Sequence, residues 1–284
     1  MPIDYDKLLA LKIPDVTQDY KAKDCILYAL ALGFGQDPVN EGELAFVRSR
    51  NPKVLPTNAA AFAYPYYWLR DLDTGADWSK SVHGEQSLKM HRPMQPQGKL
   101  VSRLRVTEVI DKGAGKGAVI YGERKLHDAD GLLATMGFSI FCRGDGGFGG
   151  PKRESPLPHP IPDRAPDLVC DLPTRPEMAL IYSLCGDDNP LHSDPAHASA
   201  AGFPRPILHG LASFGLAGRA LIQTLCGTAP ERLIALAGRF SAPVYPGEML
   251  RTEIWRDGAV ISFRLRAVER DAIAINNGRA EVTA

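Results

Sequence analysis

Residues 211–227 read LASFGLAGRALIQTLCG, a segment rich in Ala and Leu. Its apolar residues recur at helical spacing and a glycine closes it, which predicts one buried helix. Further along the chain, residues 249–257, 259–270 and 272–284 alternate β-branched and aromatic residues with polar ones. This period of two is typical of half-buried antiparallel strands. The C-terminal half is therefore predicted to end in a curled antiparallel sheet that follows the helix.

The N-terminal half repeats three signals of the C-terminal half in the same order. The pairs are YALALG (28–33) before QDP (36–38) and YSLCG (182–186) before DNP (188–190), then His83-Gly84 and His209-Gly210, then Pro93, Pro96 and Gly98 against Pro243, Pro246 and Gly247. Strand-like segments follow in this half too, at 100–110, 118–128 and 132–144. The shared order indicates a duplicated unit. Each unit is predicted to be a helix followed by its own sheet, which gives an α+β class.

The interval between the second and third signals differs between the two halves. It spans 9 positions from Gly84 to Pro93 but 33 positions from Gly210 to Pro243. The missing residues correspond to the helix at 211–227, so the N-terminal half is predicted to have a reduced central helix. The apolar space left by a lost helix could admit a bulky ligand.

Composition places the chain among ordinary globular proteins. Its 284 residues are 44% hydrophobic and 23% charged, and 33 basic residues balance 33 acidic ones. A net charge of zero lacks the broad positive field that nucleic-acid binding uses. The longest apolar runs, such as residues 25–35, are too short to cross a bilayer. We therefore expect no nucleic-acid partner and no membrane span.

Several sequence features favour a cytoplasmic protein. Five scattered cysteines contain no C-x-x-C pair and are interpreted as reduced thiols. The N-terminal residues MPIDYDKLLALKIPD lack the layout of a secretory signal. The C-terminal residues EVTA do not resemble a peroxisomal S-K-L address.

Residues 148–166, FGGPKRESPLPHPIPDRAP, divide the chain, since their six prolines disfavour helix and strand alike. We predict an N-terminal domain over 1–148, a linker over 149–166 and a C-terminal domain over 167–284.

The densest polar cluster is YSLCGDDNPLHSDP, residues 182–195. Gly186 ends the preceding helix and Pro190 prevents its continuation, which leaves 187–192 on a short turn. Asp187 and His192 could face one small space across this turn and handle two protons at one substrate. Asn189 between them could orient a water or bond its own backbone.

Two other interpretations of this cluster compete. Asp and Asn are common in plain turns, and Asp194 before Pro195 is a typical helix N-cap. His192, Asp194 and His197 lie close in sequence, but they lack a recognised metal-ligand spacing and a fourth partner. We therefore expect no metal and no separate cofactor.

Residues 182–211, YSLCGDDNPLHSDPAHASAAGFPRPILHGL, resemble the signature of the (R)-specific enoyl-CoA hydratases. This is the MaoC-like or hydratase 2 family, which includes the hydratase part of peroxisomal multifunctional enzyme type 2. The similarity continues through 239–255, and in the first half through 27–38 and 83–96. It covers almost the whole chain, from about residue 19 to 282.

The resemblance implies a double hot-dog fold, in which each half wraps an antiparallel sheet around a helix and the N-terminal helix is reduced. It also implies reversible syn addition of water to a trans-2-enoyl-CoA, which yields the (R)-3-hydroxyacyl-CoA. Asp187, Asn189 and His192 fall on the family's catalytic motif, and Gly210 on the glycine whose backbone N–H binds the thioester oxygen. A fixed N–H at a helix start suits the negative charge that hydration builds on this oxygen.

The N-terminal half lacks counterparts of Asp187 and His192, and the resemblance assigns it to ligand binding. His83 and Gly84 are expected near the acyl-CoA, Lys112 near its phosphates, and Phe240 along the same path. The remaining candidates for substrate contact are Tyr182, Asp188, Pro190 and Leu191.

The reduced helix leads us to expect medium or longer acyl chains. Three other functions fit the same fold: an acyl-carrier-protein dehydratase or specialised catabolic hydratase, a noncatalytic acyl-thioester binding module, and a hot-dog thioesterase. The complete Asp187, Asn189 and His192 set disfavours the binding module. A further homodimer is also expected.

Overall fold

One antiparallel sheet of ten strands runs through the whole structure, a computed structural model that describes residues 2–48, 50–151 and 153–283. The strands are β1 (Val16–Tyr20), β2 (Ser81–Met90), β3 (Gly98–Asp111), β4 (Ala118–Asp128), β5 (Gly131–Cys142), β6 (Leu168–Pro173), β7 (Leu233–Phe240), β8 (Met249–Asp257), β9 (Val260–Ala267) and β10 (Ala272–Val282). Their order in the sheet is β1-β3-β4-β5-β2-β7-β10-β9-β8-β6. The first five strands in this order come from the N-terminal half and the last five from the C-terminal half.

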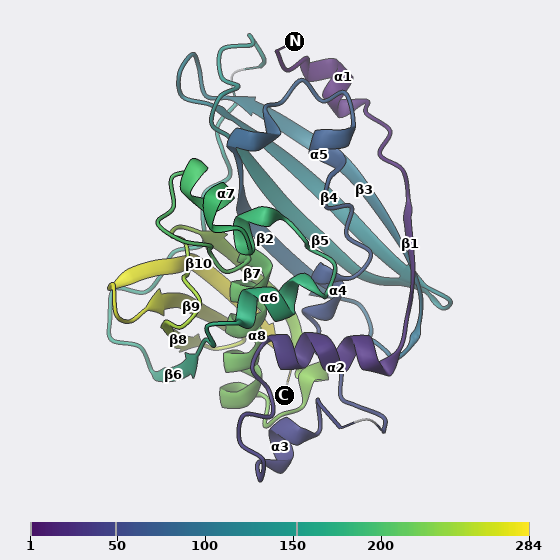
Figure 1. Ribbon diagram of the computed structural model, residues 1–284, viewed down its shortest axis with the longest axis vertical. Helices are drawn as coiled ribbons and strands as arrows, with labels where there is room; N and C mark the ends of the chain where they lie inside the picture. The colour runs from purple at the N-terminus through teal and green to yellow at the C-terminus, as the bar shows by residue number, and fades with distance from the viewer. Residues whose placement is uncertain (1, 49, 152, 284) are drawn as a thin grey trace.

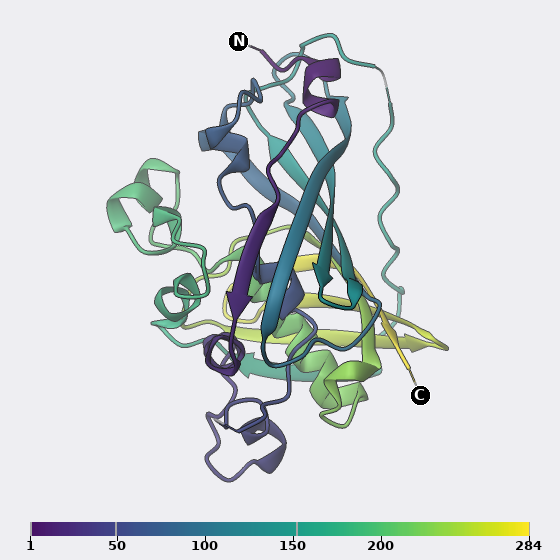
Figure 2. The ribbon, with the colours of Figure 1, turned by 90° about the vertical axis from the view of Figure 1, so that its right-hand side faces the viewer.

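The two predicted sheets, one in each half, are joined into one. β2 pairs with β7 from Glu85–Arg239 to Lys89–Ala235, so the two units are joined edge to edge. The pairing satisfies backbone groups that would otherwise remain open at the edge of each unit. Figure 2 shows the strands of the N-terminal half running at a steep angle to those of the C-terminal half. The α+β class and the two-unit architecture are confirmed.

The helices are α1 (Tyr5–Leu9), α2 (Ala22–Ala31), α3 (Glu41–Leu44), α4 (Asn58–Ala61), α5 (Trp68–Asp71), α6 (Met178–Ser183), α7 (Pro195–Ala200) and α8 (Gly210–Leu225). The predicted central helix is α8, whose residues from Leu211 to Ile222 are all buried. It lies against β6, β7 and β10 (Figure 1). No helix in the described residues is long and apolar enough to cross a membrane.

The N-terminal half has no counterpart of α8 in the described interval 84–93, so its central helix is reduced as predicted. His83-Gly84 lies inside β2 and does not start a helix as His209-Gly210 does, which corrects the expected equivalence of these two pairs. Short elements lie instead between α2 and β2: α3, α4 and α5, each of four residues, and one 3₁₀ turn at Trp78–Lys80. The two halves nevertheless share one hydrophobic core. The Tyr28 ring, for example, lies 5.9 Å from that of Tyr182 and 6.3 Å from that of Phe62.

The linker between β5 and β6 descends along the side of the sheet away from α6 and α7 (Figure 2). His159 holds it there, since its ring Nε2 lies 2.8 Å from Ser262 Oγ. Its carbonyl accepts a hydrogen bond from Asn277 Nδ2 at 2.8 Å. The linker is thus fixed to β9 and β10, and it leaves the helix-bearing side of the sheet open for a site.

Candidate active site

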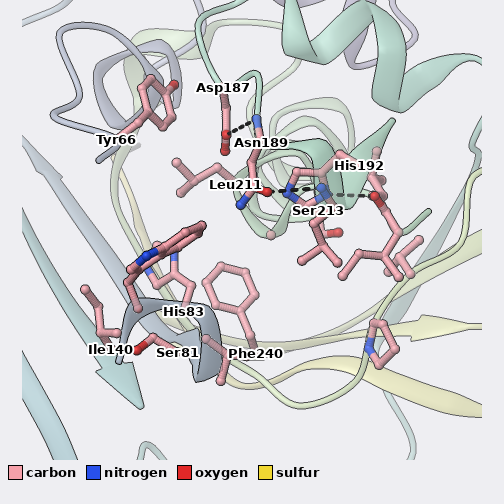
Figure 3. A pocket seen from close by; sticks show the side chains of 18 of the residues that line it. Tyr66, Ser81, His83, Ile140, Asp187, Asn189, His192, Leu211, Ser213 and Phe240 are labelled. Carbon is pink, nitrogen blue, oxygen red and sulfur yellow. Dashed lines mark hydrogen bonds between the residues drawn. The ribbon is translucent and has the colours of Figure 1, made fainter. Parts of the chain in front are cut away.

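A cavity of about 370 Å³ lies between the two halves, at the start of α8. β2 contributes His83 and β7 contributes Phe240, so the cavity lies beside the junction of the two units. Figure 3 shows these two side chains opposite Asp187, Asn189 and His192 of the C-terminal half. Its other lining residues include Tyr64, Tyr66, Tyr67, Trp68, Trp78, Ile140, Leu191, Phe203, Ile207, Gly210, Leu211 and Ser213.

The turn after α6 is built by its own polar side chains. Gly186 has a φ of 125°, a conformation that favours glycine. Asn189 Oδ1 accepts from the Leu191 N–H at 3.0 Å, and a 3₁₀ turn then spans Pro190–His192. Asp194 caps α7 by accepting from the backbone N–H groups of Ala196 and His197, as predicted. Turn formation and catalysis are therefore compatible uses of this segment.

His192 is held in one tautomer. Its Nδ1 lies 2.8 Å from the carbonyl oxygen of Ile207, and since a carbonyl only accepts, Nδ1 carries the hydrogen. The lone pair therefore resides on Nε2. Burial lowers the pKa of His192 to about 4, so the ring stays neutral and able to accept a proton near pH 7.

Asp187 is the second titratable group at the cavity. Burial raises the pKa of its carboxyl group to about 6, although the Asn189 N–H opposes this shift by donating to Oδ1 at 3.3 Å. One ligand atom from each of Asp187, His192 and His209 lies within 4.8 Å of the other two. The carboxylate and His192 are therefore close enough to hold one water between them.

His209 is a site residue that the sequence analysis named only as half of a repeated His-Gly pair. Its ring stacks on His192 with centroids 3.6 Å apart, and its Nε2 donates to the main-chain carbonyl of Asp187 at 3.0 Å. It thus supports both members of the acid–base pair.

Gly210 is the first residue of α8, as its proposed role requires. The first N–H groups of a helix have no intrahelical acceptor and lie at the positive end of the helix dipole. A Cβ at Gly210 would lie 3.4 Å from the Phe240 ring, so glycine keeps this approach open. The Phe240 ring in turn contacts His83 edge to face at 4.9 Å, and burial lowers the pKa of His83 to about 4.

The other predicted contact residues divide into two groups. Leu191, His83 and Phe240 line the cavity, whereas Gly84, Pro190, Asp188, Tyr182 and Lys112 lie outside its lining. Lys112 Nζ donates to Ser155 Oγ at 2.5 Å, and the buried Tyr182 ring lies 4.8 Å from that of His209. Substrate contacts by this second group stay predictions.

The aromatic wall of the cavity was not predicted. It comes from residues 64–70, YPYYWLR, between α4 and the end of α5. The density of aromatic residues in this short segment was the available signal. Nothing local shows that it faces the turn after α6, because the two segments meet only in the folded chain.

The fold is that of a double hot-dog protein, and a carboxyl group and an imidazole line one cavity at the start of its buried helix. Residues 18–144 match the MFE-2 hydratase 2 N-terminal domain, and residues 159–278 match the MaoC like domain. The chain is 40% identical to enoyl-CoA hydratase ChsH3 of Mycobacterium tuberculosis, with 98% of each chain covered. It is 38% identical to the peroxisomal enoyl-CoA hydratase 2 of Arabidopsis thaliana, covering 94% of this chain and 91% of that one.

A solved structure gives the same result. The crystal structure of a MaoC-like dehydratase from Phytophthora capsici superimposes with a TM-score of 0.87 at 32% identity, and 98% of each chain is covered. The chain therefore belongs to the hydratase 2 family of MaoC-like proteins.

Proposed function

We propose that this protein catalyses the reversible (R)-specific hydration of trans-2-enoyl-CoA thioesters to (R)-3-hydroxyacyl-CoA. One observation carries the proposal: the Asp187 carboxyl group and the unprotonated Nε2 of His192 share a small space beside the first N–H of α8. The names and coverage of the relatives support the same activity.

The reaction follows from the hydrogen-bonding capacity of these groups. A water that donates one hydrogen to Asp187 and the other to His192 Nε2 directs its lone pair toward C3 of the substrate. As the oxygen bonds to C3, the proton it loses passes to the pair, and C2 receives a proton from the same pair. Both atoms are thus added from one face, which makes the addition syn. The two residues titrate as a coupled pair, so the transferred protons are assigned to the pair and not to Asp187 or His192 individually.

Gly210 supplies the electrostatic part of the mechanism. Addition at C3 pushes negative charge onto the thioester oxygen, and a preorganised N–H at a helix start stabilises that charge. Asn189 uses its Oδ1 within the turn, which leaves its side-chain NH₂ to hold the water or the new hydroxyl oxygen. All these groups belong to the protein, so the proposed mechanism needs no cofactor.

The cavity supports medium or longer acyl chains as substrates, because its volume of about 370 Å³ exceeds what a short acyl group fills. We also propose a homodimer in the cytoplasm. Exposed Leu30, Leu180 and Leu184 on or next to α2 and α6, two helices in contact, support a further interface. Light scattering on the purified protein measures the oligomeric state.

The deciding experiment follows hydration of trans-2-decenoyl-CoA with chiral analysis of the product. Wild type should form (R)-3-hydroxydecanoyl-CoA, and Asp187→Ala and His192→Ala should each lose roughly 10²-fold or more in rate. His197→Ala is the matched control, since His197 lies outside the cavity lining. Binding of the thioester without turnover would instead support a noncatalytic module.

Two further readouts separate the related enzymes. Release of free CoA thiol would identify a thioesterase. Faster turnover of carrier-protein thioesters than of CoA thioesters would identify an acyl-carrier-protein dehydratase. Faster turnover of crotonyl-CoA than of decenoyl-CoA would contradict the expected chain length.

A further inference from the structure

The N-terminal half contacts the catalytic turn through residues 64–70, although it has no counterpart of the acid–base pair. This segment joins α4 to α5 and supplies Tyr66 and Tyr67 to the cavity wall. Tyr67 is bonded to Asp188, 121 positions away and next to Asp187. This hydrogen bond indicates that the segment has a structural role at the turn in addition to lining the cavity.

Tyr66 packs on the turn with its ring. A Cβ built at Gly186 would lie 3.2 Å from Tyr66 Cε2, so the ring closely approaches the residue before Asp187. The Tyr66 hydroxyl donates to the carbonyl of Ala61 at 3.0 Å, and its hydrogen is therefore not offered to the carboxyl group. Figure 3 shows Tyr66 beside Asp187 on the same side of the cavity. The ring thus borders the cavity on the side where the carboxyl group lies.

Tyr67 contacts the turn through a hydrogen bond. Its hydroxyl donates to Asp188 Oδ1 at 2.5 Å, and the guanidinium of Arg70 lies 3.9 Å above its ring. A hydrogen bond to a carboxylate is stronger than one between neutral groups. Asp188 is thereby tied to the N-terminal half while the adjacent Asp187 faces the cavity.

The segment that carries both tyrosines is itself anchored. Arg124 of β4 is almost fully buried and donates to the carbonyls of Ala59, Ala60 and Phe62 at 2.6, 2.8 and 2.9 Å. These carbonyls belong to α4 and its C-cap, where a cation also complements the helix dipole. The tyrosines therefore project from a fixed platform.

We propose that Tyr66 and Tyr67 are positioning residues for Asp187, Tyr66 by keeping water from its carboxyl group and Tyr67 by holding the turn through Asp188. The inference rests on the proposed hydratase function, in which Asp187 reacts as the carboxylate. It gives the N-terminal half a part in catalysis in addition to binding the ligand.

Desolvation is the main cause of the raised pKa of Asp187, so exposing this carboxyl group should lower that pKa. Asp188 raises this pKa as well, and the titratable and charged groups that surround Asp187 keep their identity when Tyr66 is changed. They are Asp188, His192, His209, Tyr64, Tyr67 and Tyr182, with Arg124 behind Tyr64 and Arg70 behind Tyr67.

The test measures kcat/KM against pH for trans-2-decenoyl-CoA. Wild type and Tyr66→Phe should both lose activity below a midpoint near pH 6, the pKa of Asp187 being about 6. Tyr66→Ala should move this acid limb down by roughly one unit or more, because water then reaches the carboxylate. An acid limb in Tyr66→Ala that coincides with wild type would overturn the role of Tyr66.

A double-mutant cycle tests Tyr67 independently of Tyr66. Tyr67→Phe and Asp188→Ala should each lower kcat roughly 3- to 10-fold with little change in KM, the size expected for one hydrogen bond. The double variant should be no slower than either single one, because both remove the same contact. Independent, multiplying losses would overturn the role of Tyr67. If Tyr66→Ala does not fold, this cycle still tests whether residues 64–70 position the turn.

An inactive wild type would contradict the proposed function and leave the positioning role testable. In that case, NMR titration of the ¹³C-labelled Asp187 carboxyl group in wild type and Tyr66→Ala provides the readout. A lower pKa in the variant supports the shielding role of Tyr66, and an unchanged pKa overturns it.

Discussion

Replacing Asp187 by Asn should make the protein more stable and less active. Burial raises the pKa of Asp187 from 3.8 to about 6, so the ionised carboxyl group disfavours the folded state. An acid whose pKa is raised by folding destabilises the folded state. This destabilisation is complete at pH values above the folded-state pKa and disappears at pH values below the unfolded-state pKa. Asn carries no charge, and its Oδ1 can still accept from the Asn189 N–H. The variant should therefore gain stability at alkaline pH and lose this advantage in acid.

The size of the effect follows from the two pKa values. Their difference is about 2 units, and ~1.4 kcal/mol per unit gives ~3 kcal/mol at pH 8. At pH 5 the folded state is mostly protonated and the unfolded state mostly ionised, so the advantage falls to ~1.6 kcal/mol. At ~2 °C per kcal/mol for a chain of this size, the thermal midpoint should rise ~6 °C at pH 8.

Thermal unfolding of wild type and Asp187→Asn at pH 8 and pH 5 provides the measurement, with the hydration rate determined in parallel. His197→Ala again serves as the control, with no expected change in either quantity. A variant less stable than wild type at pH 8, or equally stabilised at both pH values, would refute the desolvation argument.

Three further predictions follow from other contacts. Arg219→Met should lower the free energy of unfolding by about 3–5 kcal/mol in denaturant titrations. The substitution leaves the buried Glu43 carboxyl group without the guanidinium that binds it at 2.6 Å. Adding Glu43→Leu should recover part of the loss. Gly186→Ala should lower kcat roughly 10-fold in steady-state assays, since a Cβ there meets Tyr66 at 3.2 Å and the φ of 125° is strained for alanine. Lys112→Ala should raise KM for an enoyl-CoA but not for the pantetheine thioester, which lacks the nucleotide phosphates. Equal KM values of wild type and variant for the enoyl-CoA would show that Lys112 does not bind the phosphates.

The local patterns in the sequence predicted individual elements well. The helix expected at 211–227 is α8, and the strands expected at 118–128 and 249–257 are β4 and β8 with the same bounds. The two strands alternate because one side of each faces the core, and α8 is recognisable because it is long, apolar and buried on all sides from Leu211 to Ile222. β2 was missed, since its sequence SVHGEQSLKM has few strand-favouring residues and owes its conformation to pairing with β5 and β7.

The sequence by itself determined the duplicated architecture and the residues of the catalytic turn. Asp187, Asn189 and His192 lie within six positions, and the glycine and proline around them already dictate a turn. Only the tertiary structure decided that β2 and β7 fuse the two sheets, that His209 stacks on His192, and that Tyr66 packs against Gly186, next to Asp187. The physical reason is that these contacts depend on packing, which no local pattern records. β2 and β7 are more than 100 positions apart, as are Tyr66 and Gly186, and the rings of His192 and His209 meet only when the segment between them folds back.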